Sequence, residues 1–187
     1  MQDPEPAVTL GDFSIDVNNV RKVALEPNTS NYVYLRGTST TAVSGRTRLF
    51  YVTASIMLHP ALYSQPSNVV SDVDPKTGDP VTAIRPFQAH GPQQLVITTP
   101  FTMDNLAPPS DSGADHYCLV AECLVDGETE WPHEKAGNFA TSAEYMTWLL
   151  NEPCVCWRNV HWESNPDPDD QTFQTSFEIP RSFSLVL

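Results

Sequence analysis

The stretch HYCLVAECLV, residues 116–125, decides how this chain folds. Its apolar and β-branched residues predict a strand, and successive side chains of a strand point to opposite faces of a sheet. Cys118 and Glu122 therefore belong to one face, and Leu119 and Cys123 to the other. Because almost every residue of the stretch is apolar, we expect a strand packed inside a β domain.

Other runs of residues alternate in the same way or combine β-branched and aromatic residues. Residues 31–40 and 46–58 are separated by small polar residues and Gly45, so we expect them to form neighbouring antiparallel strands. The remaining expected strands cover residues 12–17, 93–103, 154–163, 172–180 and 182–187. Short strands at this spacing predict an all-β fold, an immunoglobulin-like sandwich of two antiparallel sheets.

One short helix is expected over residues 141–153. Thr141 and Glu144 have the spacing of a capping box, and Pro153 ends the run. Its predicted buried stripe contains Tyr145, Trp148 and Leu149. We expect this helix to plug an edge of the sandwich.

The composition limits the choice of partners. Ten Lys and Arg stand against 23 Asp and Glu, which gives a net charge of −13. Such a chain repels phosphate backbones and anionic lipid headgroups, so nucleic acid is not an expected partner. The sequence contains no apolar run of about 18 residues, so no membrane insertion is expected. Its start, MQDPEPAVTL, shows no signal peptide, which leaves two localisations open: cytoplasmic synthesis for an exported assembly, or a secreted chain whose leader has been removed.

A chain of 187 residues can bury one substantial core. We expect a flexible N-terminal arm over residues 1–11 and a single domain over residues 12–187. Residues 60–92 are interrupted repeatedly by Pro and Gly, which predicts a long Pro-rich loop. A loop of this length is either functional or contains a short strand such as residues 81–84.

Three stretches, NYVYLRGTSTTAVSGRTRLFYV, HYCLVAECL and CVCWRNVHW, together carry a family resemblance. In order and approximate spacing the chain resembles the immunoglobulin-like domains of bacterial surface, secreted and phage-associated proteins, with residues 32–36, 116–121 and 157–160 at the matching places. The chain departs from that pattern at residues 36–41, RGTSTT, where the family has Arg-x-x-Asn. The resemblance implies an immunoglobulin-like fold without enzymatic activity, and it implies no ligand.

The four cysteines could be buried thiols, form disulfides or bind zinc. Cys118 and Cys123 are separated by four residues, and Cys154 and Cys156 by one, on strand-like sequence rather than on the knuckles typical of zinc sites. Buried thiols are favoured, a disulfide between the two strands comes next, and zinc is disfavoured. His116 stands two residues before Cys118, but neither it nor His161 forms a known pattern of nucleophilic catalysis, so both are interpreted as ordinary strand residues.

Two acidic clusters raise the alternative of calcium binding, because carboxylates on loops are its preferred ligands. They contain Asp72, Asp74 and Asp79, and Asp167, Asp169 and Asp170. Neither follows the spacing of an EF-hand, so solvated acidic turns are the favoured interpretation. We therefore expect no bound metal and no cofactor.

Trp131, Tyr63 and His133 are the predicted contact residues. Trp131 lies beside Pro132 in a polar stretch and is expected to be exposed, whereas Trp157 lies in strand-like sequence and is expected in the core. Exposed aromatic rings could stack on sugars. A carbohydrate-binding module is therefore one alternative function.

The sequence as a whole predicts a non-catalytic structural or adhesive module in a bacterial or phage assembly. A rigid sandwich would present residues 60–92, residues 126–140 and its sheet edges to a protein partner or to another copy of itself. A carbohydrate-binding module is the second hypothesis. A thiol-dependent or metal-dependent enzyme is the third.

Overall fold

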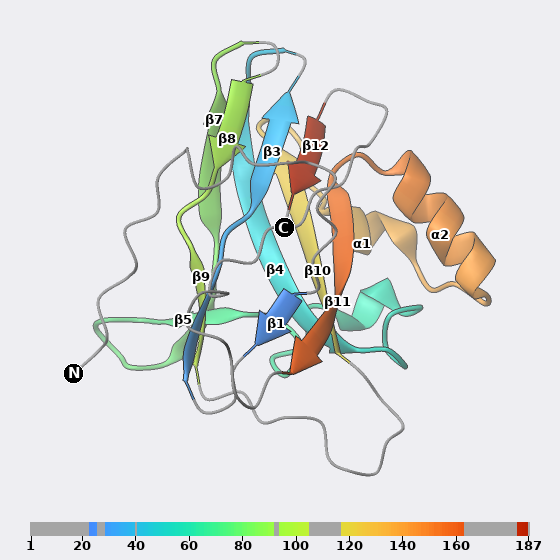
Figure 1. The fold of residues 1–187 in the computed structure, drawn as a ribbon, viewed down its shortest axis with the longest axis horizontal. Helices are drawn as coiled ribbons and strands as arrows, with labels where there is room; N and C mark the ends of the chain where they lie inside the picture. The colour runs from blue at the N-terminus through green and yellow to red at the C-terminus, as the bar shows by residue number, and fades with distance from the viewer. Residues whose placement is uncertain are drawn as a thin grey trace.

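The computed structural model describes residues 23–25, 29–39, 41–91, 94–104, 117–162 and 183–186. Strands dominate these residues, and nearly all strand pairs are antiparallel, so the expected all-β class is confirmed. The expected strands at residues 12–17 and 172–180 and the expected arm at residues 1–11 lie outside the described residues. Figure 1 shows the arrangement, with the main sheet running through the centre of the molecule.

The main sheet has five strands in the order β1-β11-β10-β4-β7. Their bounds are Val23–Leu25 for β1, Val155–Trp162 for β11, Tyr117–Val125 for β10, Val43–Thr53 for β4 and Arg85–Ala89 for β7. Strand β10 is central and pairs with β4 along its whole length, while β1 runs parallel to β11. Residues 117–125 therefore form the middle strand of the largest sheet.

A second layer of strands lies across the core from this sheet. It consists of β2 (Ser30–Val33) paired with β9 (Phe101–Asp104), and of β3 (Arg36–Ser39) between β8 (Gln94–Ile97) and β12 (Phe183–Val186). The expectation that residues 31–40 pair with residues 46–58 is wrong, because β2 and β3 lie in this second layer and β4 in the first. The buried side chains of Val33 and Leu35 explain the difference, since both contribute to the core between the layers.

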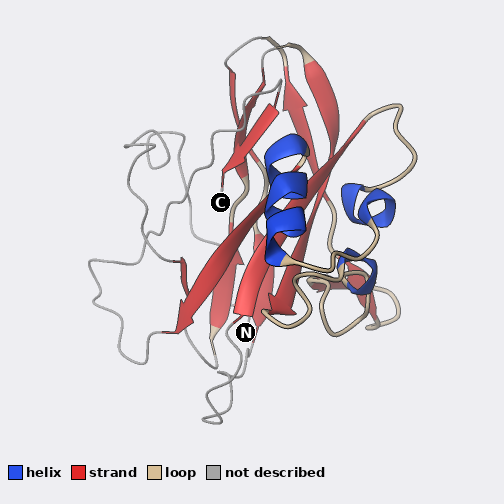
Figure 2. Cartoon of the chain, turned by 90° about the vertical axis from the view of Figure 1, so that its right-hand side faces the viewer, coloured by secondary structure: helices blue, strands red, loops and turns tan. Residues whose placement is uncertain are grey.

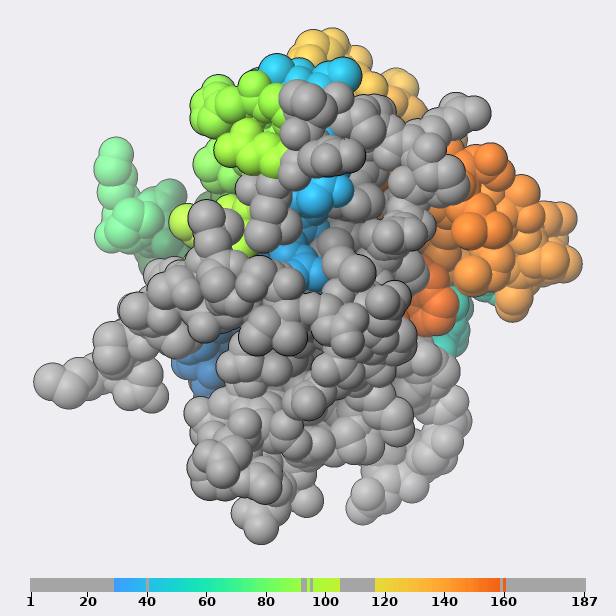
Figure 3. All heavy atoms as spheres, turned by 45° about the horizontal axis from the view of Figure 1, so that its top comes forward, coloured from blue at the N-terminus to red at the C-terminus, as the bar shows by residue number. Residues whose placement is uncertain are grey.

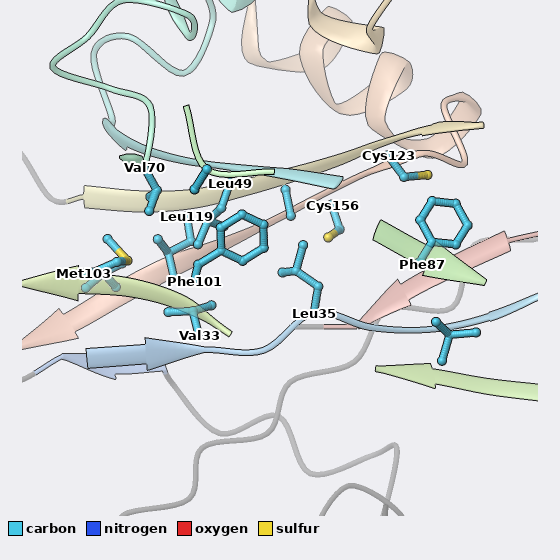
Figure 4. Close-up of a cluster of buried hydrophobic side chains, with 14 of the residues drawn as sticks. Val33, Leu35, Leu49, Val70, Phe87, Phe101, Met103, Leu119, Cys123 and Cys156 are labelled. Atoms are coloured by element: carbon cyan, nitrogen blue, oxygen red, sulfur yellow. The ribbon is translucent and has the colours of Figure 1, made fainter. Parts of the chain in front are cut away.

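The core between the two layers is almost entirely apolar. Leu49 and Leu119 reach it from the main sheet, and Leu35 and Phe101 reach it from the opposing strands, each at most 1% exposed. Figure 4 shows these side chains meeting between the ribbons of the two layers. This packing supplies most of the apolar burial that holds the layers together.

The outer face of the main sheet is covered by helical segments, which Figure 2 shows together on one side of the strands. They are the 3₁₀ turn η2 (Pro60–Leu62), α1 (Pro132–Ala136) and α2 (Ser142–Asn151). A second apolar cluster forms beneath them; its buried members are Phe50, Val52, Tyr63, Cys118, Val120, Tyr145, Leu149 and Val155. The prediction of one helix at an edge is therefore wrong, because three helical segments form a layer over a face.

Helix α2 itself follows its sequence signals. The Thr141 hydroxyl accepts a hydrogen bond from the Glu144 backbone N–H at 3.2 Å, and the Glu144 carboxylate accepts one from the Ala140 N–H at 2.9 Å. Tyr145 and Leu149 are buried against the sheet, as the predicted stripe requires. None of the helices in the described part of the chain has the length and apolar character needed to span a membrane.

Residues 60–92 do not form one long loop. The segment contains η2, the hairpin strands β5 (Ser71–Val73) and β6 (Pro80–Thr82), and β7. The Pro and Gly residues separate short elements rather than prevent them, since Gly78 adopts a positive φ of 77° in the hairpin turn. The strand predicted at residues 81–84 overlaps β6, which covers Pro80–Thr82.

Candidate functional site

A chain of three polar side chains connects β10, α1 and the turn after η2 on the outer face of the main sheet. Nδ1 of His133 lies 2.7 Å from Oε1 of Glu122, and Nε2 of His133 lies 2.6 Å from Oγ of Ser64. Glu122 and His133 are 1% and 2% exposed, whereas Ser64 is exposed. We call these three residues the outer-face triad. They bring together the two segments that the sequence analysis singled out as loops.

The position of Glu122 follows from the alternation of β10. Its side chain lies on the Cys118 face, directly opposite Arg48 of β4. Its second oxygen, Oε2, accepts the backbone N–H of His133 at 3.1 Å. Burial raises the pKa of Glu122, while the bonds from His133 and the charge of Arg48 act in the opposite direction. Both carboxylate oxygens are thus satisfied by His133.

Helix α1 is what places His133 over the sheet. Pro132 occupies its first turn, and Oε2 of Glu134 accepts the backbone N–H of Trp131 at 2.8 Å. Gly137 ends the helix with φ of 69°. The polar loop predicted for this stretch is wrong; Pro132 followed by Glu134 is the sequence signal that indicates the helix.

Aromatic rings enclose the imidazole. The His133 ring meets Phe50 edge-on at 5.2 Å between centroids and stacks towards Tyr63 at 6.4 Å. The Tyr63 hydroxyl donates to the backbone carbonyl of Met57 and lies 3.3 Å from the Tyr145 hydroxyl. Burial raises the pKa of the Tyr63 phenol, so the ring remains neutral. The rings fix the plane of the imidazole.

The turn that carries Ser64 is anchored to β4. The Tyr51 N–H donates to the Asn68 carbonyl at 2.7 Å, and the Val70 N–H donates to the Leu49 carbonyl at 2.9 Å. The Asn68 side-chain amide in turn donates to the carbonyl of Leu62 at 2.9 Å. Ser64 is therefore exposed on a segment whose backbone is tied down on both sides.

Trp131 does not occupy the exposed position that was predicted. It is 4% exposed, and the Arg48 guanidinium lies 3.9 Å from the centroid of its ring, a cation–π contact. Arg46 approaches the same ring at 5.7 Å. The apolar ring is covered because α1 turns it onto the two arginines of β4.

The three predicted contact residues, Trp131, Tyr63 and His133, do gather around this site. All three are buried, so their predicted role in partner contact stays a prediction. Glu122 and Ser64 are not among the residues predicted from the sequence. A single acidic residue inside the apolar run LVAECLV was the available signal for Glu122, because a charge buried in a strand requires a partner. Nothing in the sequence around Ser64 distinguishes it from Ser67.

The four cysteines are present as free thiols. Cys118 lies in the outer cluster and Cys123 in the inner one, as the alternation of β10 requires. Cys123 and Cys154 are in side-chain hydrogen-bond contact, and the Cys123 N–H donates to the Cys154 carbonyl at 2.8 Å. Burial raises the pKa of the Cys156 thiol to about 12. A disulfide between the two strands stays a prediction, and Cys123 and Cys154 are the pair in contact.

The first acidic cluster is used within the protein. The guanidinium of Arg85 holds Asp72 through two bonds of 2.6 and 2.7 Å, and Oδ1 of Asp74 accepts the Lys76 backbone N–H at 2.7 Å. Within the described ranges, no group of three or more His, Cys, Asp or Glu side chains is arranged to hold a metal ion. His116 and the second acidic cluster at residues 167–170 lie outside those ranges.

No protein-family model matches the chain, and the search of curated proteins gives no significant match. The order of carboxylate, imidazole and hydroxyl is the one that lets an imidazole take the proton of a hydroxyl group.

Proposed function

We propose that the protein is a structural module that binds other proteins through the β5–β6 hairpin, with association between copies of the chain as its simplest form. A structural or adhesive role in a bacterial or phage assembly is the setting that the family resemblance implies. One observation carries the proposal. Three large apolar residues on and beside the hairpin are exposed: Val73 at 69%, Val81 at 43% and Ile84 at 41%.

Both faces of the hairpin carry one of these side chains. In the register of the pair, Val73 lies opposite Pro80, and Val81 lies opposite Asp72 on the other face. Two-stranded hairpins are marginally stable by themselves, and free strand edges readily accept a further strand. Figure 3 shows the segment standing out from the surface. This geometry supports strand addition, with the valines as apolar contacts.

The base of the hairpin is firmly held. The Ala83 N–H donates to the Val70 carbonyl at 2.9 Å, and the Arg85–Asp72 ion pair links β7 to β5. The tip carries Asp74, Lys76 and Asp79. A partner would therefore meet a projecting arm on a fixed base rather than a freely moving loop.

Association between copies has to overcome their net charge of −13. Salt screens the repulsion between exposed charges over roughly 10 Å at 0.1 M, so association should strengthen as salt is added. Sedimentation velocity over a concentration series at low and high salt measures this directly. We expect the weight-average mass of the wild-type protein to rise with concentration, and more steeply at high salt.

The test compares a double and a single variant in which exposed apolar residues are replaced by Asp. The double variant Val73→Asp/Val81→Asp should remain monomeric, while Leu150→Asp should associate as the wild type does, because Leu150 is 68% exposed on α2 instead. A wild-type protein that stays monomeric at every concentration and salt level would contradict the proposal. So would association of the double variant at wild-type strength.

The carbohydrate-binding alternative depended on an exposed Trp131. Since Arg48 covers that ring, no observation favours this function and we do not propose it.

A further inference from the structure

We infer that Ser64 is a nucleophilic serine, activated by His133 and oriented through Glu122, that takes the acyl group of small carboxylic esters. The inference goes beyond protein binding and does not depend on it, because the outer-face triad and the β5–β6 hairpin share no residue. It rests on three observations: the order of hydrogen bonds, the contrast in burial, and the anchoring of the Ser64 turn.

The hydrogen bonds point to the imidazole nitrogen that carries the proton. Glu122 accepts the backbone N–H of His133 through Oε2 and meets Nδ1 of the same residue through Oε1. Burial raises the pKa of Glu122, and the bonds from His133 and the positive charge of Arg48, directly across the strand pair, oppose that rise. With Glu122 as acceptor, Nδ1 bears the hydrogen and the lone pair of Nε2 faces the Ser64 hydroxyl. This tautomer is the one that a general base needs.

Of the three side chains, only that of Ser64 is exposed, so its Oγ is the atom that a substrate can reach. Glu122 and His133 have almost no exposed surface, so water does not compete for their hydrogen bonds. Ser64 lies above them at the surface, where a dissolved ester can reach it. Because its turn is hydrogen-bonded to β4 through Asn68, the hydroxyl is held over the imidazole before any substrate arrives.

The reaction is an acyl transfer in two balanced steps. Oγ of Ser64 attacks the ester carbonyl carbon while its proton passes to Nε2 of His133. The bond to the leaving alcohol then breaks, and that alcohol takes the proton from Nε2, which leaves an ester on Ser64. Water next attacks the acyl carbon and gives a proton to Nε2, which returns it to Oγ as the carboxylic acid departs. The sum is ester plus water giving acid plus alcohol.

Ser67 offers a matched comparison within the same turn. It is also exposed, but its Oγ faces the Asn68 side chain at 3.4 Å rather than an imidazole. A difference in reactivity between the two serines therefore reports the contribution of His133. General bases typically raise rates by about 10²- to 10⁴-fold.

The experiment uses a fluorophosphonate probe on the full chain, with the labelled serine identified by peptide mapping. We expect labelling of Ser64 to be at least about 100-fold faster than that of Ser67 in the same molecule. Ser64→Ala should remove the fast labelling, and Ser67→Ala should leave it unchanged. A small activated ester such as p-nitrophenyl acetate should likewise deposit its acetyl group on Ser64.

His133→Gln should reduce labelling of Ser64 to the level of Ser67. Because that variant alters a buried partner, its folding is checked by circular dichroism, and the comparison within the wild-type molecule stands without it. Equal labelling rates at Ser64 and Ser67, or no labelling at either, would overturn the inference. Neither result would affect association through the hairpin, so the two proposals fail separately.

Discussion

The two faces of β10 are both buried, yet they are buried in different ways. Towards the second strand layer, Leu119, Ala121 and Cys123 enter a core of apolar side chains. Towards the helical layer, Cys118 and Val120 are followed by the buried Glu122, which is bonded to His133. One strand thus separates an apolar interior from a polar network.

The difference shows what a single buried charge imposes on a fold. The inner face requires only apolar side chains of suitable volume, which residues from many elements can supply. The outer face requires hydrogen bonds for both oxygens of Glu122, and one residue, His133, supplies both. Helix α1 is held over the sheet by that requirement, so reactivity and stability share the same contacts.

The largest expected effect comes from breaking the outer network. His133→Leu leaves the buried carboxyl group of Glu122 without its hydrogen-bond partner, and losing one member of a buried pair costs about 3–5 kcal/mol. Urea unfolding measures the loss. On the inner face Leu119→Ala should cost a similar amount, about 2–5 kcal/mol, through lost apolar contact and a cavity.

A double substitution distinguishes the two mechanisms. Glu122→Leu combined with His133→Leu removes the charge together with its partner, so most of the stability lost in His133→Leu should return. If the double variant is as unstable as the sum of the two single variants, the network is not what holds the outer face.

Cys156, on the inner face, should make the stability of the protein depend on pH above pH 9. Burial raises the pKa of Cys156 from 9.0 to about 12, so between these values the unfolded chain loses the thiol proton while the folded chain keeps it. The folded state then binds more protons, and stability must fall as pH rises through this window. The full rise corresponds to about 4 kcal/mol, present below pH 9 and lost by about pH 12. Cys156→Ala should flatten this part of the stability profile; an unchanged slope would show that other groups cause it.

Tyr63→Phe tests the neutral part of the outer network. The substitution removes the hydroxyl that donates to Met57 and meets Tyr145, while the ring against Phe50 remains. We expect a loss of about 1 kcal/mol in the free energy of unfolding. A loss as large as that of His133→Leu would mean that the phenol, not the imidazole, is central to this face.

Substitutions in the β5–β6 hairpin should have the smallest effect on the free energy of unfolding. Val73→Asp changes an exposed side chain and should alter the free energy of unfolding by less than about 0.5 kcal/mol. Chemical denaturation of this variant beside the wild type checks the value. A larger loss would place Val73 in a contact within the monomer and weaken its assignment to partner binding.

Much of the fold could be predicted from local patterns. The alternation of residues 116–125 gave the two faces of β10, and Thr141 with Glu144 located the start of α2. These predictions succeeded because each depends on neighbours in sequence: strand pleat in one case, hydrogen bonds of a first helical turn in the other.

The failures concern partners that are distant in sequence. Residues 31–40 and 46–58 both read as strands, but their alternation does not say which layer each one joins. The residues of the outer-face triad are separated by 58 and 11 positions, since they stand at 64, 122 and 133, and only the folded sheet brings them together. The acidic side chain of Glu122 within an apolar strand indicates that a buried partner must exist, but it does not indicate which residue that partner is. No feature of the sequence near Ser64 indicates its role.

Glu122 fixes the tautomer of His133 and so leaves Nε2 free to accept the Ser64 proton. Nitrogen-15 NMR of protein labelled in histidine measures it directly at pH 8. We expect His133 to carry its proton on Nδ1, in a hydrogen bond that disappears in Glu122→Leu because a leucine side chain has no acceptor. A His133 with its proton on Nε2, or with the same nitrogen shifts in Glu122→Leu, would show that Glu122 does not set the tautomer.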